Sequence, residues 1–314
     1  MDMNKKRELR AKKRSEKENK KQDNNLTINW FPGHMTKTRR QIEANLKYVD
    51  AVAEIIDARV PISSRNPDLD KIIQTKPRIV LMNKCDMADA KVTAKWVEYF
   101  KNKGIASVVL DCKTGKGVNN FVPAVRELLA DKIKSWENKG MVNPTIKVMV
   151  VGIPNVGKSS FINKMAKKDR AKAEDRPGVT RGNQWFSVGN NFDILDTPGV
   201  LWPKFDDPKV GEKLAFTGAV KDQVMDIELL AVRLLEVLKE RPTQSFITRF
   251  KLEDVQLNEF EAYDLLEVIG RKRGMLMSGG HIDTLRASNV LLDEYRGAKL
   301  GNITLESPED LGLV

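Results

Sequence analysis

Short apolar runs alternate with amphipathic stretches over the first two thirds of the chain. The runs rich in β-branched residues lie at 49–57, 78–82, 106–110, 146–151 and 192–195. Most of the intervening stretches, such as 91–101 and 119–134, show the three- and four-residue apolar spacing of helices that bury one face. Buried strands alternating with helices predict an α/β fold with a doubly wound, mainly parallel sheet.

The last third of the chain has a different pattern. The segment 203–213 has two prolines and several charges, which favours a domain boundary. Beyond it, apolar residues from Ile227 to Leu238 follow one helical face, and Arg241-Pro242 ends that helix. Further helices are expected at 258–273 and 282–296. The pattern predicts a small all-α C-terminal domain.

Charge divides the chain into three parts. The net charge is +11, of which residues 1–24 carry +5, while residues 220–314 carry −5. The N-terminal tail has almost no apolar residues, so burial cannot offset the entropy of ordering it. We expect a disordered tail at 1–25, an α/β domain at 26–205 and a helical domain at 206–314. The tail is either a solvated extension or an arm that contacts RNA phosphates.

Several classes of protein are excluded by composition. No apolar run approaches the ~18 residues of a membrane span, and the charged N-terminus does not resemble a signal peptide. The chain has only two cysteines, Cys85 and Cys112, too few for a disulfide framework or a four-cysteine zinc site. We expect a cytoplasmic protein with no membrane partner.

Residues 152–159 carry the strongest chemical signal. They read Gly-Ile-Pro-Asn-Val-Gly-Lys-Ser, follow the run 146–151 and precede a helical stretch, as the phosphate-loop pattern G-x-x-x-x-G-K-[ST] requires. In this pattern the lysine reaches the β- and γ-phosphates and the serine hydroxyl ligates Mg²⁺. The sequence therefore predicts phosphate contacts at Asn155, Val156, Gly157, Lys158, Ser159 and Ser160.

A second phosphate motif follows the run 192–195. Asp196-Thr197-Pro198-Gly199 places a carboxylate at a strand end, where it would hold Mg²⁺ through water, and the Gly199 N–H would meet the γ-phosphate. Thr180, in the segment between the two motifs, is the candidate for a further Mg²⁺ ligand from a loop that orders with the γ-phosphate.

Two segments that follow strands suit recognition of a guanine base. Asn83-Lys84-Cys85-Asp86 follows the run 78–82, and the Asp86 carboxylate would accept two guanine N–H donors that adenine lacks. Asn83 would steady the neighbouring loops, and the Lys84 stem would cover the ring. The second segment, 111–115, follows the run 106–110 and offers a backbone N–H at Cys112 or Lys113 for the guanine carbonyl.

The order of these motifs is unusual, because the base motifs precede the phosphate loop. Only the connections of an ordinary GTP-binding domain need to change, which is a circular permutation. With Trp30-Phe31-Pro32-Gly33-His34-Met35 and Asp57-Ala58-Arg59-Val60-Pro61, the chain resembles the circularly permuted GTPases that help mature the large ribosomal subunit in bacteria. The resemblance runs from about residue 29 to the C-terminus.

The resemblance implies further roles at the site. Val200 stands where many signalling GTPases have a glutamine that orients water, and the resemblance points instead to His34 as the catalytic residue. Asn155 matches an asparagine that helps to bind K⁺ in similar GTPases, although an ordinary loop asparagine is equally compatible with the sequence. Arg271, Lys272 and Arg273 are candidate RNA contacts, or else helix C-capping residues.

The function implied is hydrolysis of GTP in late maturation of the large (50S) ribosomal subunit. The protein would bind the subunit precursor and its rRNA in the GTP state and leave after hydrolysis, which the subunit would stimulate. The cofactors would be Mg²⁺ and, with Asn155, K⁺; no DNA partner is expected, and the protein would be monomeric away from the ribosome. The alternatives are a nucleotide-gated RNA-binding protein in which hydrolysis is incidental and, against the guanine motifs, a small-molecule kinase.

Overall fold

The computed structural model describes residues 32–73, 76–168, 173–174, 184–189, 191–199, 207–220 and 226–313. For residues 32–38, 167–168 and 173–174 it describes the backbone alone. The predicted tail at 1–25 and the candidate ligand Thr180 lie outside these ranges.

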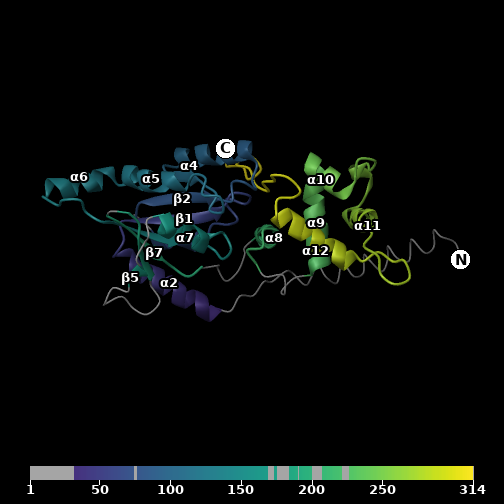
Figure 1. Cartoon of the computed structure of the whole chain (residues 1–314), viewed down its shortest axis with the longest axis horizontal. Coiled ribbons are helices and arrows are strands. Elements are labelled where there is room, and N and C mark those ends of the chain that lie inside the picture. Colours follow the sequence, from purple (N-terminus) through teal and green to yellow (C-terminus); the bar gives the residue numbers. More distant parts are fainter. Residues whose placement is uncertain are drawn as a thin grey trace.

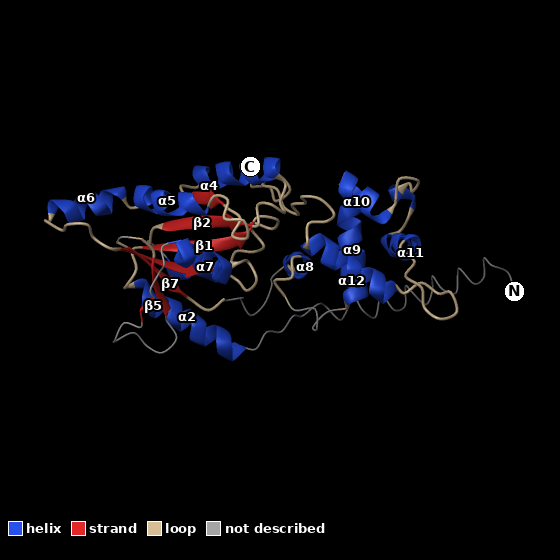
Figure 2. Ribbon diagram, in the orientation of Figure 1, coloured by secondary structure: helices blue, strands red, loops and turns tan. Residues whose placement is uncertain are grey.

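A seven-stranded sheet forms the centre of the larger domain, in the order β3-β2-β1-β4-β7-β6-β5 (Figure 2). The five strands from β3 to β7 in this order are parallel, and β7, β6 and β5 pair antiparallel at one edge. The predicted doubly wound, mainly parallel sheet is confirmed, while the short edge strands β5 and β6 were not predicted. The strands are β1 (Ala51–Asp57), β2 (Arg78–Asn83), β3 (Ala106–Val109), β4 (Ile146–Val151), β5 (Ala173–Glu174), β6 (Gln184–Ser187) and β7 (Phe192–Asp196).

Helices cover both faces of this sheet. On one face α5 (Phe121–Leu128) and α7 (Lys158–Lys168) pack through an aromatic cluster, in which Phe121 lies 5.0 Å from Phe161, centroid to centroid. The other face carries α2 (Pro32–Leu46), α3 (Pro67–Ile73) and α4 (Ala90–Asn102). Alternate β1 residues enter the two cores, because successive side chains of a strand point to opposite faces. The predicted helix at 119–134 is divided into η1 (Val118–Asn120), α5 and α6 (Ala130–Asn138).

The strand order reverses between β1 and β4. In a parallel sheet with helices on both faces, such a reversal opens a crevice beyond the carboxyl ends of the two strands. The segments that follow β1, β2 and β4 therefore meet at one edge of the sheet. These are the segments that carry the D-A-R-V-P, N-K-C-D and phosphate-loop motifs.

The C-terminal part is helical, and α9 (Ile227–Glu240) lies at its centre (Figure 1). The apolar residues predicted to share one face of α9, including Leu230, Leu234 and Leu238, are buried. The other elements are α8 (Pro208–Phe216), α10 (Gln244–Phe250), η3 (Leu257–Glu259), α11 (Ala262–Lys272) and α12 (Thr284–Arg296). In the described residues, no helix is long and apolar enough to cross a membrane.

The predicted boundary at 203–213 contains the start of a helix instead. Asp207 is the N-cap of α8, with its carboxylate accepting from the Lys209 N–H at 2.8 Å, and Pro208 occupies the first turn. Proline is favoured there because its missing N–H has no intrahelical partner in any case. The pair Asp207-Pro208 is therefore a helix start.

After α12 the chain returns to the α/β domain, where it lies beside α4 (Figure 1). The Ile303 N–H donates to the Met87 carbonyl at 3.2 Å, and the Leu305 N–H donates to the Arg59 carbonyl at 2.8 Å. We call residues 303–310 the C-terminal strap. The range 206–314 predicted for the helical domain thus includes a last segment that contacts the α/β domain.

Candidate active site

A cleft of about 650 Å³ opens beyond the carboxyl ends of the central strands. It unites the base motifs with the phosphate loop, although the base motifs come first in the sequence. The predicted Val156 and Asp196 flank it: Val156 is buried next to the loop and Asp196 pairs with Lys158. The lining residues are Asn83, Lys84, Asp86, Met87, Asp111, Cys112, Lys113, Ile153, Pro154, Asn155, Gly157, Lys158, Ser159, Ser160 and Gly199.

The phosphate loop connects β4 to the first turn of α7. Gly157 has a φ of 101°, and a side chain there would collide with the Asn83 amide, so only glycine fits. Asn155 also has a left-handed φ, 62°, which asparagine tolerates better than most residues. Because Lys158 begins α7, the unpaired N–H groups of that helix face the cleft and favour an anion.

Lys158 and Asp196 form an ion pair at the floor of the phosphate side, with Nζ 2.6 Å from Oδ1. The Thr197 hydroxyl donates to the Val150 carbonyl at 2.7 Å, which fixes the end of β7 beside β4. A bound phosphate would take the lysine away from Asp196. The Ser159 hydroxyl and the Asp196 carboxylate are hard oxygen donors, which fit Mg²⁺.

Asn83 connects the base side to the phosphate side. Its Nδ2 donates to the Val156 carbonyl at 2.7 Å, and its Oδ1 accepts from the Cys112 N–H at 3.0 Å. Burial raises the pKa of the Cys112 thiol to about 12. Cys112 therefore contributes a thiol rather than a thiolate, and its backbone N–H is bonded to Asn83.

The second base loop is closed by Asp111 and Lys164, two residues that the sequence interpretation did not assign to the site. The Asp111 carboxylate accepts from the Lys113 N–H at 2.7 Å and the Thr114 N–H at 3.1 Å. Burial acts to raise the pKa of Asp111, but these hydrogen bonds outweigh it and the pKa is lowered. From α7, Lys164 Nζ donates to the Thr114 carbonyl at 3.2 Å. An aspartate that opens a loop and can accept from the N–H two residues later is a signal for such a turn.

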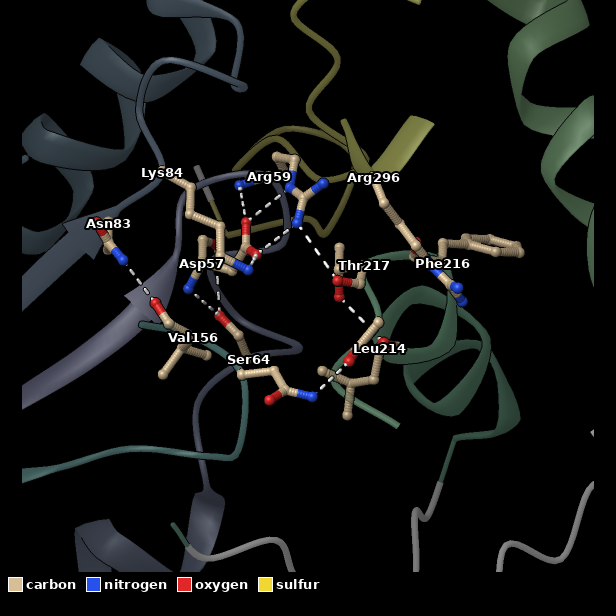
Figure 3. A network of polar contacts seen from close by, with 12 residues as sticks. Asp57, Arg59, Ser64, Asn83, Lys84, Val156, Leu214, Phe216, Thr217 and Arg296 are labelled. Atoms are coloured by element: carbon tan, nitrogen blue, oxygen red, sulfur yellow. Dashed lines mark hydrogen bonds and ion pairs between the residues drawn. The ribbon is translucent and has the colours of Figure 1, made fainter. Parts of the chain in front are cut away.

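Lys84 points back toward β1. It has a left-handed φ of 60°, and its Nζ lies 2.9 Å from the Asp57 Oδ2 (Figure 3). Asp57 also receives three hydrogen bonds from Arg59, from the backbone N–H at 3.0 Å, from Nε at 3.0 Å and from Nη2 at 2.8 Å. Burial acts to raise the pKa of Asp57, but the two cations outweigh it and hold the pKa well below its usual range. In the sequence analysis, Asp57 and Arg59 were used only as parts of a motif that carries the family resemblance.

The remaining predicted residues lie apart from the cleft or outside the described side chains. His34 falls in the first turn of α2, where only the backbone is described. Arg271 is exposed in the last turn of α11, whereas Lys272 pairs with Asp254. Arg273 Nη1 donates to the Arg249 carbonyl at 3.1 Å, and its guanidinium lies over the Phe250 ring. Two of the three candidate RNA contacts, Lys272 and Arg273, are thus bound to other residues of the helical domain.

Comparison with known proteins gives one consistent family. A family model described as "50S ribosome-binding GTPase" matches residues 147–266, from β4 into α11. A ribosome biogenesis GTPase A of Bacillus cereus is 45% identical over 287 residues, which cover 91% of this chain and 96% of that protein. The Thermotoga maritima protein of the same name is 34% identical and covers 90% and 96% of the two chains.

Solved structures agree with the sequence relatives. A GDP-bound structure of YlqF from T. maritima superposes with a TM-score of 0.63 at 30% identity, covering 86% of this chain and all of that one. A GNP-bound YlqF structure from T. maritima gives a TM-score of 0.61 and covers 87% and 99%. The circularly permuted GTPase domain predicted from the motif order is thereby confirmed, as is GTP hydrolysis. The chain belongs to the ribosome biogenesis GTPase A family.

Proposed function

We propose that this GTPase is an assembly factor in late maturation of the large (50S) ribosomal subunit. It binds the subunit precursor and its rRNA in the GTP state and leaves after hydrolysis. The observation that carries the proposal is the cleft that joins a phosphate loop to a guanine-selective motif, with Gly218, just after α8 of the helical domain, hydrogen-bonded to Asn155 at its rim. The relatives' names and the family model support the ribosomal partner.

Phosphate binding is assigned to residues 155–160 and Gly199. The Lys158 ammonium leaves Asp196 for the β- and γ-phosphates, and the α7 N-terminus stabilises their charge. Mg²⁺, held by Ser159, by Asp196 through water and by Thr180, would neutralise charge that develops on the phosphates during hydrolysis. A side chain at position 199 would press against Pro154 of the phosphate loop. Glycine at this position therefore lets the backbone N–H approach the γ-phosphate.

Guanine selection is assigned to Asp86, with Asn83, Lys84, Cys112 and Lys113 around the base. Asp86 is exposed at the rim of the cleft, where its carboxylate can accept from the ring N1–H and the exocyclic amine. The Asn83 bridge holds this loop beside Val156, so the spacing from base to phosphates is fixed by hydrogen bonds. An ATP-dependent small-molecule kinase would not need such a carboxylate.

His34 is assigned as the residue that orients the attacking water. A neutral imidazole suits this role near pH 7, and Val200 has no polar side chain to perform it. His34→Ala should lower turnover by about 100-fold while leaving GTP affinity within about twofold. Unchanged turnover would remove His34 from the mechanism. His281, an exposed histidine of the helical domain, provides the matched control variant.

Asn155 is assigned to a K⁺ site beside the phosphates, where the cation would act as an arginine finger does. Its Nδ2 donates to the Gly218 carbonyl at 2.8 Å, so the side-chain oxygen remains for a cation. Turnover in K⁺ should exceed turnover in Na⁺ by about tenfold, and Asn155→Ala should abolish the difference. Equal rates in the two salts would exclude this site.

Contact with rRNA phosphates is assigned to the helical domain through Arg271, with Lys272 and Arg273 contributing once their present partners exchange for phosphate. Arg271→Glu should weaken binding to large subunits by about tenfold with GTP affinity unchanged. Charge reversal at Arg126, in the last turn of α5 in the other domain, is the control.

The decisive experiment combines depletion in the cell with purified particles. Sucrose gradients after depletion should show large-subunit precursors, and those particles should bind the GTP-loaded protein, stimulate its turnover and release the GDP-loaded protein. Binding without stimulation would favour the alternative in which hydrolysis is incidental. Normal gradients and no nucleotide-dependent binding would overturn the assembly role.

A further inference from the structure

Two buried charged residues and a partly buried lysine form a group beside the guanine loop. Asp57 ends β1, Arg59 follows two residues later, and Lys84 extends toward them from the loop after β2 (Figure 3). The Asp57 and Arg59 residues are only 2% and 1% exposed, respectively. One buried carboxylate thus receives both cations: Arg59 is buried with it, and Lys84 reaches it from the cleft, where its side chain is 21% exposed.

Lys84 needs this carboxylate to hold its conformation. Its φ of 60° is a left-handed backbone that lysine rarely adopts, and such strain persists only when surrounding contacts compensate for it. The Asp57–Lys84 ion pair is one such contact, beside the hydrogen bonds from the Cys85 N–H to the Leu110 carbonyl and from the Met87 N–H to the Lys84 carbonyl. It draws the side chain inward across the base side of the cleft, of which Lys84 is a lining residue. The position of the lysine at the base is therefore set from β1.

Arg59 extends the same group to the helical domain. Its Nη2 lies 3.5 Å from the Thr217 carbonyl, just after the end of α8, while its guanidinium packs over the Tyr295 ring of α12. The last carbonyls of a helix have no intrahelical partners. Arg296 donates to the two carbonyls that precede that of Thr217, with Nη2 2.8 Å from the Ala215 oxygen and Nε 3.2 Å from the Phe216 oxygen.

We propose that Asp57 and Arg59 are positioning residues for guanine recognition: Asp57 places Lys84 at the base, and Arg59 holds Asp57 while binding the end of α8. Occupation of the base site and the seating of the helical domain are then coupled through one buried ion pair. The inference rests on the proposed guanine site. It does not depend on the ribosomal role, because every consequence concerns the isolated protein and its nucleotide.

The test is a double-mutant cycle on the purified full chain. Asp57→Asn keeps the shape and removes the charge, and Lys84→Met keeps the stem and removes the ammonium. Each variant should bind GDP at least about tenfold more weakly than the wild type, and the double variant should be no weaker than the weaker single variant. For Asp57→Asn, the turnover number at saturating GTP should stay within about twofold of the wild-type value, so the loss appears in KM.

Glu54 provides the matched control. It is on the same strand, is 1% exposed and accepts from Arg65 Nε at 3.1 Å on the side of the sheet away from the cleft. Glu54→Gln should lower the melting temperature without changing GDP affinity. The positioning role is wrong if Asp57→Asn, like Glu54→Gln, lowers the melting temperature without changing GDP affinity. It is also wrong if the losses of GDP affinity in Asp57→Asn and Lys84→Met multiply in the double variant.

A second measurement tests the connection to α8 and remains available if Asp57→Asn does not fold. Arg59→Lys keeps the positive charge but loses the guanidinium fork. Amides of 217–219, which donate into the last turn of α8, should exchange more slowly in the wild type with GDP than without it. This protection should disappear in Arg59→Lys; retained protection would overturn the coupling.

The same data separate failure of the inference from failure of the guanine site. A Lys84→Met variant with weakened binding, together with an unaffected Asp57→Asn variant, would overturn the inference alone. Unchanged GDP affinity in both variants would remove Lys84 from the base site, and the inference would fall with it.

Discussion

The phosphate side and the base side of the cleft are built in different ways. One continuous segment, residues 152–160, supplies nearly all of the phosphate side, and β7 adds Asp196. The base side needs the ends of β1, β2 and β3, a lysine from α7 and the C-terminal strap. A local segment can lose one side chain and keep its shape, whereas a site assembled from distant segments depends on the contacts between them.

Removal of the phosphate-loop lysine should have the largest effect. Lys158→Ala deletes the charge that meets the phosphates and leaves the Asp196 carboxylate unpaired in the site, where it repels them. We expect GTP affinity to fall by at least about 100-fold, measured by titration calorimetry.

Lys164→Met on the same helix sharpens the comparison. Lys164 binds the Thr114 carbonyl on the base side, so its loss should loosen one of several contacts and lower affinity by only about threefold. If Lys164→Met lowered GTP affinity as much as Lys158→Ala does, the base loop would depend on a single residue as strongly as the phosphate loop does.

A change of base preference should follow from Asp86→Asn. The amide loses one acceptor for guanine and gains an N–H donor that matches the carbonyl of xanthine. Affinity for GTP should fall by about 50-fold and affinity for XTP should rise, as measured by competition against a fluorescent nucleotide.

Asp89→Asn is the neighbouring control for this substitution. Asp89 is the N-cap of α4 and accepts from the Lys91 and Val92 N–H groups, a role that asparagine fills about equally well. It should leave both stability and base preference nearly unchanged. A shift in base preference in this variant would mean that the loop as a whole, rather than the Asp86 carboxylate, selects the base.

The difference between the phosphate side and the base side of the cleft also explains which features could be predicted from the sequence. The phosphate loop was predicted residue by residue because the turn, the glycines and the helix start are all local. The parallel strands were predicted because each is a short apolar run, whereas β6 begins at an exposed glutamine and offers only a weak signal. The segment that contains the start of α8 was interpreted only as a domain boundary, because Pro208 is both a helix initiator and a typical boundary residue.

The contacts between distant segments could not be predicted in the same way. Nothing local to Asp57 indicates that its partner is Lys84, and nothing local to Arg59 indicates the Thr217 carbonyl. The same applies to the strap, where Glu306 looks like an ordinary surface glutamate but is only 1% exposed. Ion pairs of this kind depend on the completed fold, so a single sequence shows the residues without their pairing.

The smallest effect on nucleotide binding should come from the strap, with its main cost in stability. The Glu306 carboxylate accepts from the Ile62 N–H at 2.8 Å, from the Ser63 N–H at 3.1 Å and from the Ser63 hydroxyl, and it pairs with Lys213 at 3.0 Å. Glu306→Gln places an N–H group among these donors and leaves Lys213 without its counter-charge. We expect the free energy of unfolding to fall by about 3 kcal/mol.

Glu309→Gln, three residues further along the strap, tests whether burial of Glu306 is the reason for the expected loss of stability. Glu309 is half exposed and pairs with the exposed Lys95 at 2.7 Å, so water can replace the contact and the urea midpoint should not move. GDP affinity in Glu306→Gln should fall by less than about threefold, because the strap reaches the base through Met87 and Arg59 rather than directly. A larger loss than in Asp86→Asn would reverse the ranking and make the strap a principal determinant of base binding.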